Sequence, residues 1–225
     1  MKIIVLGDGL LGSEIVKQTN WNYLSRMKDG IDFCSPKSYD DKICEYDTVI
    51  NCIGYTDTYS QDKEKHRQIN YESVSILSDI CDKNNKKLIH ISTDYVYSNS
   101  IGDASETDIP LISENWYSYY KLMADEYIIL KNKNYLICRT SFKPNPFPYD
   151  VAWIDQIGNF DYVDVISNLI IKLIITEQSG VYNVGTVLKT MYELALSTNK
   201  NVKIGLKPNY VPHNVSMNLT KLNNV

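Results

Sequence analysis

The sequence predicts an α/β fold, a doubly wound parallel sheet with a small C-terminal lobe. Short apolar runs of strand length alternate with segments whose apolar residues recur at helical spacing. The first run, residues 3–6, leads directly into Gly7, Gly9 and Gly12 and then into an amphipathic segment. Two further runs, 47–52 and 87–92, end in small or polar residues. This order of elements is Rossmann-like.

The elements follow in order from these patterns. We predict strands at 3–6, near 31–34, at 47–52, 87–92 and 135–138, and near 151–154. We predict helices at 11–18, 68–82, 117–131 and 163–176. Pro144, Pro146 and Pro148 mark a loop between the main alternation and the C-terminal elements, because proline cannot donate to a ladder or continue a helix.

The glycine turn predicts a dinucleotide site. In a strand–turn–helix context, Gly7 makes the turn, Gly9 lets the backbone approach a pyrophosphate, and Gly12 allows the helix to pack on the strand. The helix N-terminus adds free N–H groups and a positive dipole end. We therefore expect residues 1–141 to form an NAD(P)-binding domain. Residues 142–225 would form a reduced substrate lobe interleaved with its last elements.

A second motif pair predicts proton transfer at a carbonyl oxygen. Thr93 lies at the end of the strand 87–92, and in a parallel sheet that edge binds ligands. Tyr117 and Lys121 are four residues apart on a predicted helix, so both side chains can reach one ligand. A lysine cation beside a phenol is expected to lower the tyrosine pKa. His90, just before this strand end, is interpreted as a structural residue.

Composition excludes several classes. The 225 residues carry a net charge of −4, which gives no basic footprint for nucleic acid. No apolar run reaches membrane-spanning length, and the start of the chain does not read as a signal peptide, so we expect a cytoplasmic protein. The five cysteines are scattered without metal-ligand spacing, and we expect no metal site.

Segments in order along nearly the whole chain carry a family resemblance. They are 49–51, 55–57, 90–97, 106–108 with Pro110, 117–121, 139–141, 155–158, 162–165, 180–185 and 214–222. With these segments the chain resembles the extended short-chain dehydrogenases/reductases, and within them the dTDP-4-dehydrorhamnose reductases. The resemblance implies an NAD(P)H-dependent reductase of a nucleotide-linked 4-keto-6-deoxy sugar, serving deoxysugar and surface polysaccharide biosynthesis.

The resemblance also implies residue roles. Tyr117 would donate the proton, Lys121 would hold the nicotinamide ribose, and Thr93 would bind the substrate carbonyl. Asp94 and Phe142 would line the sugar pocket, where the family usually has tryptophan at the latter position. Asn70 lies in a predicted helix and is either a cofactor contact or a solvated polar residue. Its position alone does not decide between the two, and we keep it as a candidate. The full set of cofactor candidates is Gly7, Gly9, Leu10, Leu11, Gly12, Cys52, Ile53, Gly54, Asn70, Ser92, Tyr117 and Lys121.

Several alternatives stay open. Only thirteen residues separate Ser141 from Asp155, where the family generally inserts a longer segment, so the substrate lobe is expected to be small. A non-catalytic NAD(P)-binding regulator or sensor, or a nucleotide-sugar epimerase, is therefore an alternative. Ser35 and Lys37 follow the expected strand 31–34 and slightly favour NADPH over NADH. The sequence leaves a homodimer open.

Overall fold

The computed structural model describes residues 1–108, 110 and 115–225. In this part of the chain a six-stranded parallel sheet has the order β10-β5-β4-β3-β1-β2. The strands are β1 (Ile3–Leu6), β2 (Asn22–Leu24), β3 (Thr48–Asn51), β4 (Lys87–Thr93), β5 (Tyr135–Thr140) and β10 (Gly180–Val184). The chain winds outward from β1 in both directions, so the prediction of a Rossmann-like doubly wound sheet is confirmed.

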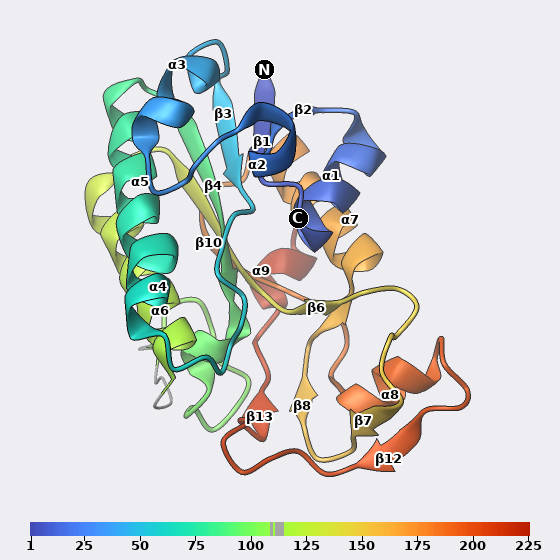
Figure 1. Cartoon of the computed structure of the whole chain (residues 1–225). Coiled ribbons are helices and arrows are strands. Elements are labelled where there is room, and N and C mark those ends of the chain that lie inside the picture. Colours follow the sequence, from blue (N-terminus) through green and yellow to red (C-terminus); the bar gives the residue numbers. More distant parts are fainter. Residues whose placement is uncertain (109, 111–114) are drawn as a thin grey trace.

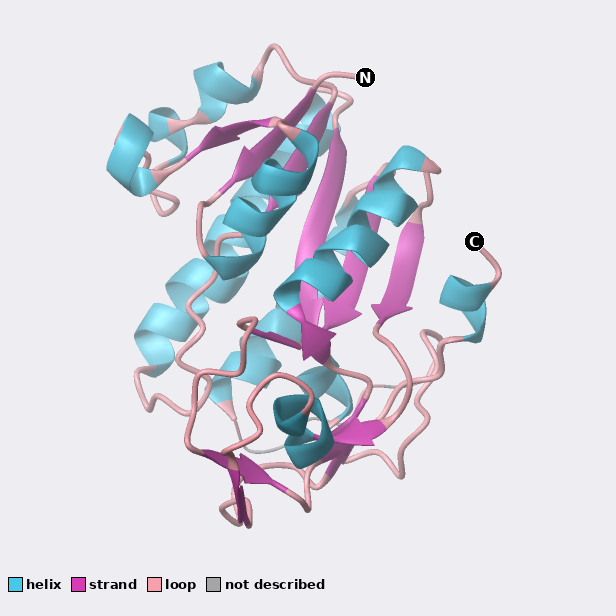
Figure 2. Ribbon diagram, turned by 90° about the vertical axis from the view of Figure 1, so that its right-hand side faces the viewer, coloured by secondary structure: helices cyan, strands magenta, loops and turns pink. Residues whose placement is uncertain are grey.

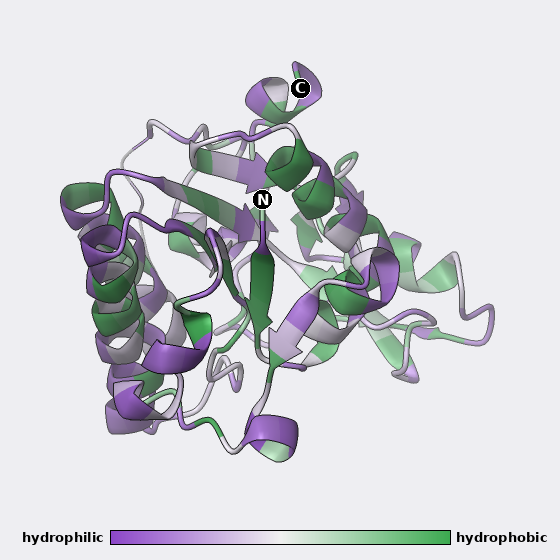
Figure 3. Ribbon diagram, turned by 90° about the horizontal axis from the view of Figure 1, so that it is seen from above, coloured by the Kyte–Doolittle hydropathy of each residue, from purple (hydrophilic) through white to green (hydrophobic). Residues whose placement is uncertain are grey.

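Helices cover both faces of this sheet (Figure 3). The helices α1 (Leu10–Thr19) and α7 (Val163–Ile175) pack together on one face. The other face carries α4 (Lys63–Arg67), the π-helical segment η2 (Gln68–Glu72), α5 (Ser73–Lys83) and α6 (Trp116–Lys131). Short helical turns, α2 (Arg26–Asp29), η1 (Pro36–Ser38) and α3 (Asp40–Ile43), connect β2 to β3.

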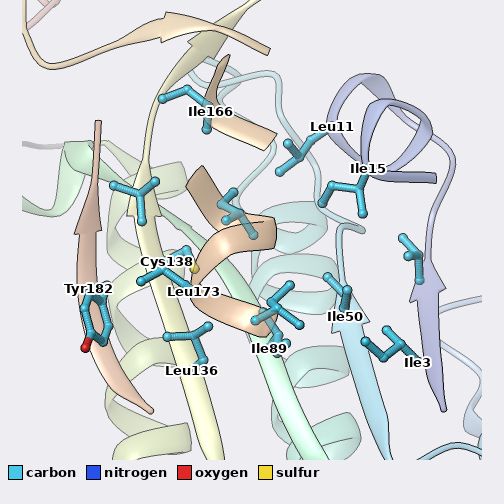
Figure 4. Close-up of a cluster of buried hydrophobic side chains, with 14 of the residues drawn as sticks. Ile3, Leu11, Ile15, Ile50, Ile89, Leu136, Cys138, Ile166, Leu173 and Tyr182 are labelled. Atoms are coloured by element: carbon cyan, nitrogen blue, oxygen red, sulfur yellow. The ribbon is translucent and has the colours of Figure 1, made fainter. Parts of the chain in front are cut away.

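Alternation along the strands divides the core into two layers. Ile3 and Val5 face the α1 and α7 side, whereas Ile4 and Leu6 face the α5 and α6 side. Figure 4 shows the first layer, in which strand residues such as Ile50 and Ile89 meet Leu11 of α1 and Leu173 of α7. Because both faces are buried, β1 is a continuous apolar run and β3 has Val49 and Ile50 at its centre, which explains why both strands were predictable.

A smaller lobe lies beyond the carboxyl ends of the strands (Figure 2). Its own cluster includes Phe147, Phe160, Tyr162 and Met191. It contains β6 (Phe142–Lys143), β7 (Val151–Trp153), β8 (Ile157–Gly158), β9 (Asp161–Tyr162), β11 (Lys189–Thr190), α8 (Met191–Leu196), β12 (Lys203–Gly205) and β13 (Asn214–Val215). The chain then returns to the main sheet, where α9 (Thr220–Asn223) contacts β10.

One predicted strand is wrong. Residues 31–34 are a loop with a turn at Phe33 and Cys34, and the second strand of the sheet is β2, nine residues earlier in the chain. β2 is a short edge strand with an exposed Asn22, so its sequence lacks an apolar alternation. Ile31 and Phe33 are buried because their loop contributes to the core layer that contains α5 and α6. Their alternation therefore has the same burial pattern as a strand.

None of the described helices combines the length and the apolar character that a membrane crossing requires.

Candidate active site

The glycine turn joins β1 to α1 in the geometry that the sequence indicates. Gly7 has φ +96°, a left-handed conformation that favours glycine, and its N–H donates to the Leu24 carbonyl at 2.9 Å. A Cβ on Gly12 would lie 2.0 Å from the Gly7 carbonyl oxygen, so helix and turn touch at this point. Gly9 precedes the first turn of α1 and has no neighbour within 4 Å of an added Cβ. The backbone is therefore open at Gly9 and closed at Gly12.

The ends of β1, β3, β4 and β5 meet at one cavity of about 440 Å³. Such a convergence is expected, because parallel strands present their carboxyl ends at the same sheet edge. Every predicted site residue except Gly7 and Gly12, which shape the turn, lines this cavity. The predicted residues at its wall are Gly9, Leu10, Leu11, Cys52, Ile53, Gly54, Asn70, Ser92, Thr93, Asp94, Tyr117, Lys121 and Phe142.

Thr93 and Tyr117 both lie on the cavity wall. Thr93 ends β4 and caps the 3₁₀ turn η3 (Asp94–Tyr97), where its hydroxyl accepts the Tyr95 N–H at 3.2 Å. Tyr117 lies in the first turn of α6, which begins after Asn115; the Asn115 side chain caps this helix by accepting the Ser118 N–H at 3.0 Å. Burial raises the pKa of Tyr117 to about 12, against the lowering effect of the nearby Thr93 side chain.

The expectation that Lys121 lowers the Tyr117 pKa is wrong for this structure. Burial is the dominant cause of the shift, and Lys121 is not among the groups that act on this phenol. Lys121 instead points into the interior, where Nζ donates to the Ile91 carbonyl at 2.5 Å and lies 3.0 Å from His90 Nε2. Its side chain is buried, and burial lowers the Lys121 pKa to about 8.

Asp94 is an incompletely paired carboxyl group at the cavity. It is 1% exposed; Oδ1 accepts from the Thr93 hydroxyl at 3.3 Å, while Oδ2 has no partner among the described residues. Burial raises its pKa to about 7, partly offset by the nearby Lys143 ammonium. Such a group is a hydrogen-bond donor when protonated and an acceptor when ionised, and it changes between the two near neutral pH.

Asn70 lies at the cavity on the π-helical segment η2, a kind of helix irregularity that is frequent at functional sites. Its amide makes two hydrogen bonds to the Tyr55 backbone, with Oδ1 accepting the N–H at 2.8 Å and Nδ2 donating to the carbonyl at 2.9 Å. These bonds fix the segment that follows β3. The structure therefore gives Asn70 a role in positioning Gly54 and its neighbours, and it is not a solvated side chain.

Several cavity residues were not predicted from sequence. Lys143 and Tyr149 come from the proline-containing segment after β5, and Thr140 has a buried hydroxyl without a partner in the described residues. The remaining additions are Thr56, Thr58, Ile91, Tyr95, Ser141 and Pro144. Lys143 enters because β6 pairs with β9, a contact between distant two-residue strands. The only local signal was its position next to Phe142.

A second cavity of about 490 Å³ adjoins the first, with Lys143 and Tyr149 in both walls. Its lining is mostly apolar and aromatic, including Phe147, Trp153 and Met191, together with Asp150, Val151 and Ala152. Most of these residues belong to the short segment between β5 and β8. The lobe thus carries a cavity that continues the site away from the glycine turn.

The sheet, the glycine turn and the Thr–Tyr–Lys constellation together define an extended short-chain dehydrogenase/reductase. The family model for the RmlD substrate binding domain matches residues 1–143, more than half of the chain. The chain belongs to this family.

Individual relatives agree with the family match. The spore coat polysaccharide biosynthesis protein SpsK of Bacillus subtilis (strain 168) is 24% identical over 218 residues, covering 86% of this chain and 77% of that protein. A dTDP-4-dehydrorhamnose reductase structure from Clostridium acetobutylicum superimposes with a TM-score of 0.82 at 20% identity, covering 96% of this chain and 90% of that one. One from Bacillus anthracis, in complex with NADP, gives 0.83 at 21% identity, covering 99% and 91%. At these identities the structural likeness shows the fold.

Proposed function

We propose that this protein is an NAD(P)H-dependent reductase of a nucleotide-linked 4-keto-6-deoxy sugar, acting in deoxysugar and surface polysaccharide biosynthesis. The observation that carries the proposal is that Thr93, Tyr117 and Lys121 line one cavity together with the start of α1. The family match and the activities named for the reductases of C. acetobutylicum and B. anthracis support the sugar class. The name of SpsK supports the link to polysaccharide synthesis.

The residues at the glycine turn fit a dinucleotide. Gly9 leaves room for a phosphate group, and the first turn of α1 has neither an acidic residue nor a side-chain cap that would compete for its N–H groups. Gly9, Leu10 and Leu11 would hold the pyrophosphate, and Lys121 the nicotinamide ribose. Cys52, Ile53, Gly54 and Ser92 line the path between them. When bound, the reduced cofactor supplies a hydride to the carbonyl carbon.

The protein's own residues account for the proton. Because burial raises the Tyr117 pKa to about 12, the phenol keeps its proton at neutral pH, which is the state that a reduction requires of its acid. Thr93 would hold the carbonyl oxygen beside this phenol, so the alkoxide that forms takes the proton from Tyr117. The resulting phenolate then regains a proton from solvent.

The preference for NADPH now depends on different residues. Because β2 ends at Leu24, the positions beside the adenine ribose are those that follow it, and Ser35 and Lys37 no longer support the preference. Ser25 and Arg26 come directly after β2, and Arg26 is exposed. An exposed arginine at this strand end suits a 2′-phosphate, so we keep NADPH as the preferred cofactor and NADH as the alternative.

The second cavity would hold the nucleotide part of the substrate. Lys143 stands where the two cavities join, suitably placed for the diphosphate, and aromatic walls beyond it suit a flat base. We keep the division into residues 1–141 and 142–225 as the proposed cofactor and substrate parts. A cytoplasmic location and a homodimer stay predictions.

The test is turnover by a variant that lacks only the phenolic hydroxyl. NADPH and NADH oxidation would be followed with a dTDP-4-keto-6-deoxy sugar generated in place. Tyr117→Phe should lower turnover by roughly 100-fold or more, as expected when a general acid is lost, with cofactor affinity nearly unchanged. Tyr119→Phe is a matched control, because Tyr119 lies in the same helix but is 39% exposed.

Undiminished turnover in Tyr117→Phe would rule out this mechanism. If the wild-type protein binds cofactor but reduces none of a panel of nucleotide keto-sugars, the sensor alternative would replace the reductase.

A further inference from the structure

A buried polar row connects β3 to the site lysine. Asn51 Nδ2 lies 3.2 Å from His90 Nδ1, and His90 Nε2 lies 3.0 Å from Lys121 Nζ. Asn51, His90 and Lys121 are 1%, 0% and 4% exposed, so all three side chains are shielded from solvent. The hydrogen atoms along this row must therefore be shared among the three side chains.

The orientation of Asn51 is fixed by the backbone. Its Oδ1 accepts the N–H of Ile53 at 3.1 Å, which turns the Nδ2 donor toward His90. A neutral imidazole has one donor nitrogen and one acceptor nitrogen. With Nδ1 accepting from Asn51, the hydrogen of His90 is on Nε2 and faces Lys121.

This arrangement depends on the charge of Lys121. An ammonium has three donors and no acceptor, so it cannot take a hydrogen bond from His90 Nε2–H. An amine can accept that bond while still donating to the Ile91 carbonyl. When Lys121 is an ammonium, His90 must offer a bare Nε2, carry its hydrogen on Nδ1 and lose the bond from Asn51. Each charge state of Lys121 therefore belongs to a different tautomer of His90.

The surrounding charges permit both states. Asp125 of α6 has Oδ1 4.0 Å from His90 Nε2, and its Oδ2 accepts from Ser92 and from Arg139 of β5. Asp125 favours the Lys121 ammonium, whereas burial opposes it and lowers the Lys121 pKa to about 8. Burial and Lys121 together lower the His90 pKa well below its usual value, so the imidazole stays neutral. Cys52, at the end of β3, is a neutral thiol because burial raises its pKa to about 12.

We infer that His90 is a positioning residue that holds Lys121 inside the protein and exchanges tautomers as Lys121 gains or loses its proton. The part of this inference that concerns cofactor rests on the proposed function, in which Lys121 binds ribose hydroxyls. Those hydroxyls are acceptors for an ammonium, so cofactor binding draws a proton from solvent onto Lys121. The His90 hydrogen moves from Nε2 to Nδ1 at the same time.

The first test uses the free protein and needs no ligand. Nitrogen-15 NMR of the imidazole rings distinguishes the tautomers, and only three histidines contribute signals. His90 should carry its hydrogen on Nε2 well above pH 8 and on Nδ1 well below it, without becoming an imidazolium. A single tautomer across this range, or a positively charged ring, would overturn the inference, whatever the protein turns out to reduce.

The second test measures protons taken up when cofactor binds. NADPH binding would be titrated by calorimetry in buffers of different ionisation enthalpy. The protein should take up nearly one proton on binding at about pH 9, and little at pH 7, because at pH 7 Lys121 is already charged before NADPH binds. His90→Gln places a permanent acceptor near Lys121 and should move this uptake upward by about one pH unit. His213→Gln, which alters the histidine before β13, is the control.

Equal uptake curves in wild-type protein and His90→Gln would refute the coupling. If neither NADPH nor NADH binds, this would count against the proposed function. The NMR test of the His90 tautomers would not be affected, because it uses the free protein.

Discussion

Replacement of Asp94 by asparagine should stabilise the protein, and by more as the pH rises. The carboxyl is 1% exposed, its Oδ2 has no partner among the described residues, and burial raises its pKa to about 7. An ionised carboxylate in this position gives up its hydration. In return it has only the nearby Lys143, a long hydrogen bond from the Thr93 hydroxyl and the backbone N–H groups of Asp94 and Tyr95, which do not offset the effect of burial. Asparagine has nearly the same shape and does not ionise.

The sign and size follow from the pKa. The pKa of Asp94 in the folded protein lies above the ordinary aspartate value of 3.8. The stabilising contribution of the neutral carboxyl is therefore present below about pH 4 and is lost as the pH rises through about 7. A pKa that is about three higher in the folded than in the unfolded protein corresponds to about 4 kcal/mol in the free energy of unfolding. Between about pH 5 and pH 8, the advantage of Asp94→Asn in the free energy of unfolding should grow by roughly 2–3 kcal/mol.

Urea unfolding of both proteins at several pH values measures this difference. Asp41→Asn, at an exposed position in α3, controls for the general effect of removing one negative charge. A constant difference between Asp94→Asn and wild type from pH 5 to pH 8 would mean that Asp94 is solvated or fully paired, and the reasoning would fail.

Two further predictions concern packing. Gly12→Ala should destabilise the fold by about 1–3 kcal/mol and abolish NADPH binding, because the added Cβ would meet the Gly7 carbonyl. Gly9→Ala is the control, and it should leave the urea midpoint unchanged because no atom lies within 4 Å of its added Cβ. A normal midpoint in Gly12→Ala would show that the turn can move. Arg139→Met should cost about 3–5 kcal/mol in the free energy of unfolding, since it leaves buried Asp125 without its ion pair. Arg67→Met breaks an exposed pair, and an equal loss there would contradict the argument from burial.

The parts of the fold that sequence predicted are those with a local signature. β1 is apolar, and β4 and β5 have buried apolar residues along much of their length, because helices cover both of their faces. α6 and α7 carry apolar residues at helical spacing. β2 has no such signature: it is three residues long, at the sheet edge, and recognisable only through its pairing with β1. The apparent strand at 31–34 is a loop whose apolar side chains fill the same core layer.

The site residues can likewise be divided into those with a local sequence signature and those without one. Gly9, Thr93 and Tyr117 could be placed because each lies in a contiguous motif whose spacing has a chemical reason. Lys143 and Tyr149 reach the cavity only through the folding of the short lobe segment, which no local pattern encodes. The helix motif also could not predict the surroundings of Lys121, because its contact with His90 joins a residue of a helix to a residue of a strand.

A row of buried polar contacts connects β10 and the C-terminal segment to the site. Asp125 binds Arg139, whose Nη1 donates to the Tyr97 hydroxyl at 2.6 Å, and this hydroxyl lies 3.1 Å from Asn183 Oδ1 on β10. Asn183 Nδ2 in turn donates to the carbonyls of Ala104 and Asn218.

A row of directional bonds therefore runs from Lys121's neighbour Asp125 across β5 to β10 and the C-terminal segment. Apolar packing alone would tolerate small shifts of β10, whereas these bonds have fixed lengths and angles. The C-terminal elements thus do more than close the sheet: they hold Arg139 against Asp125, and Asp125 in turn sets the electrostatic environment of His90 and Lys121 at the centre of the site.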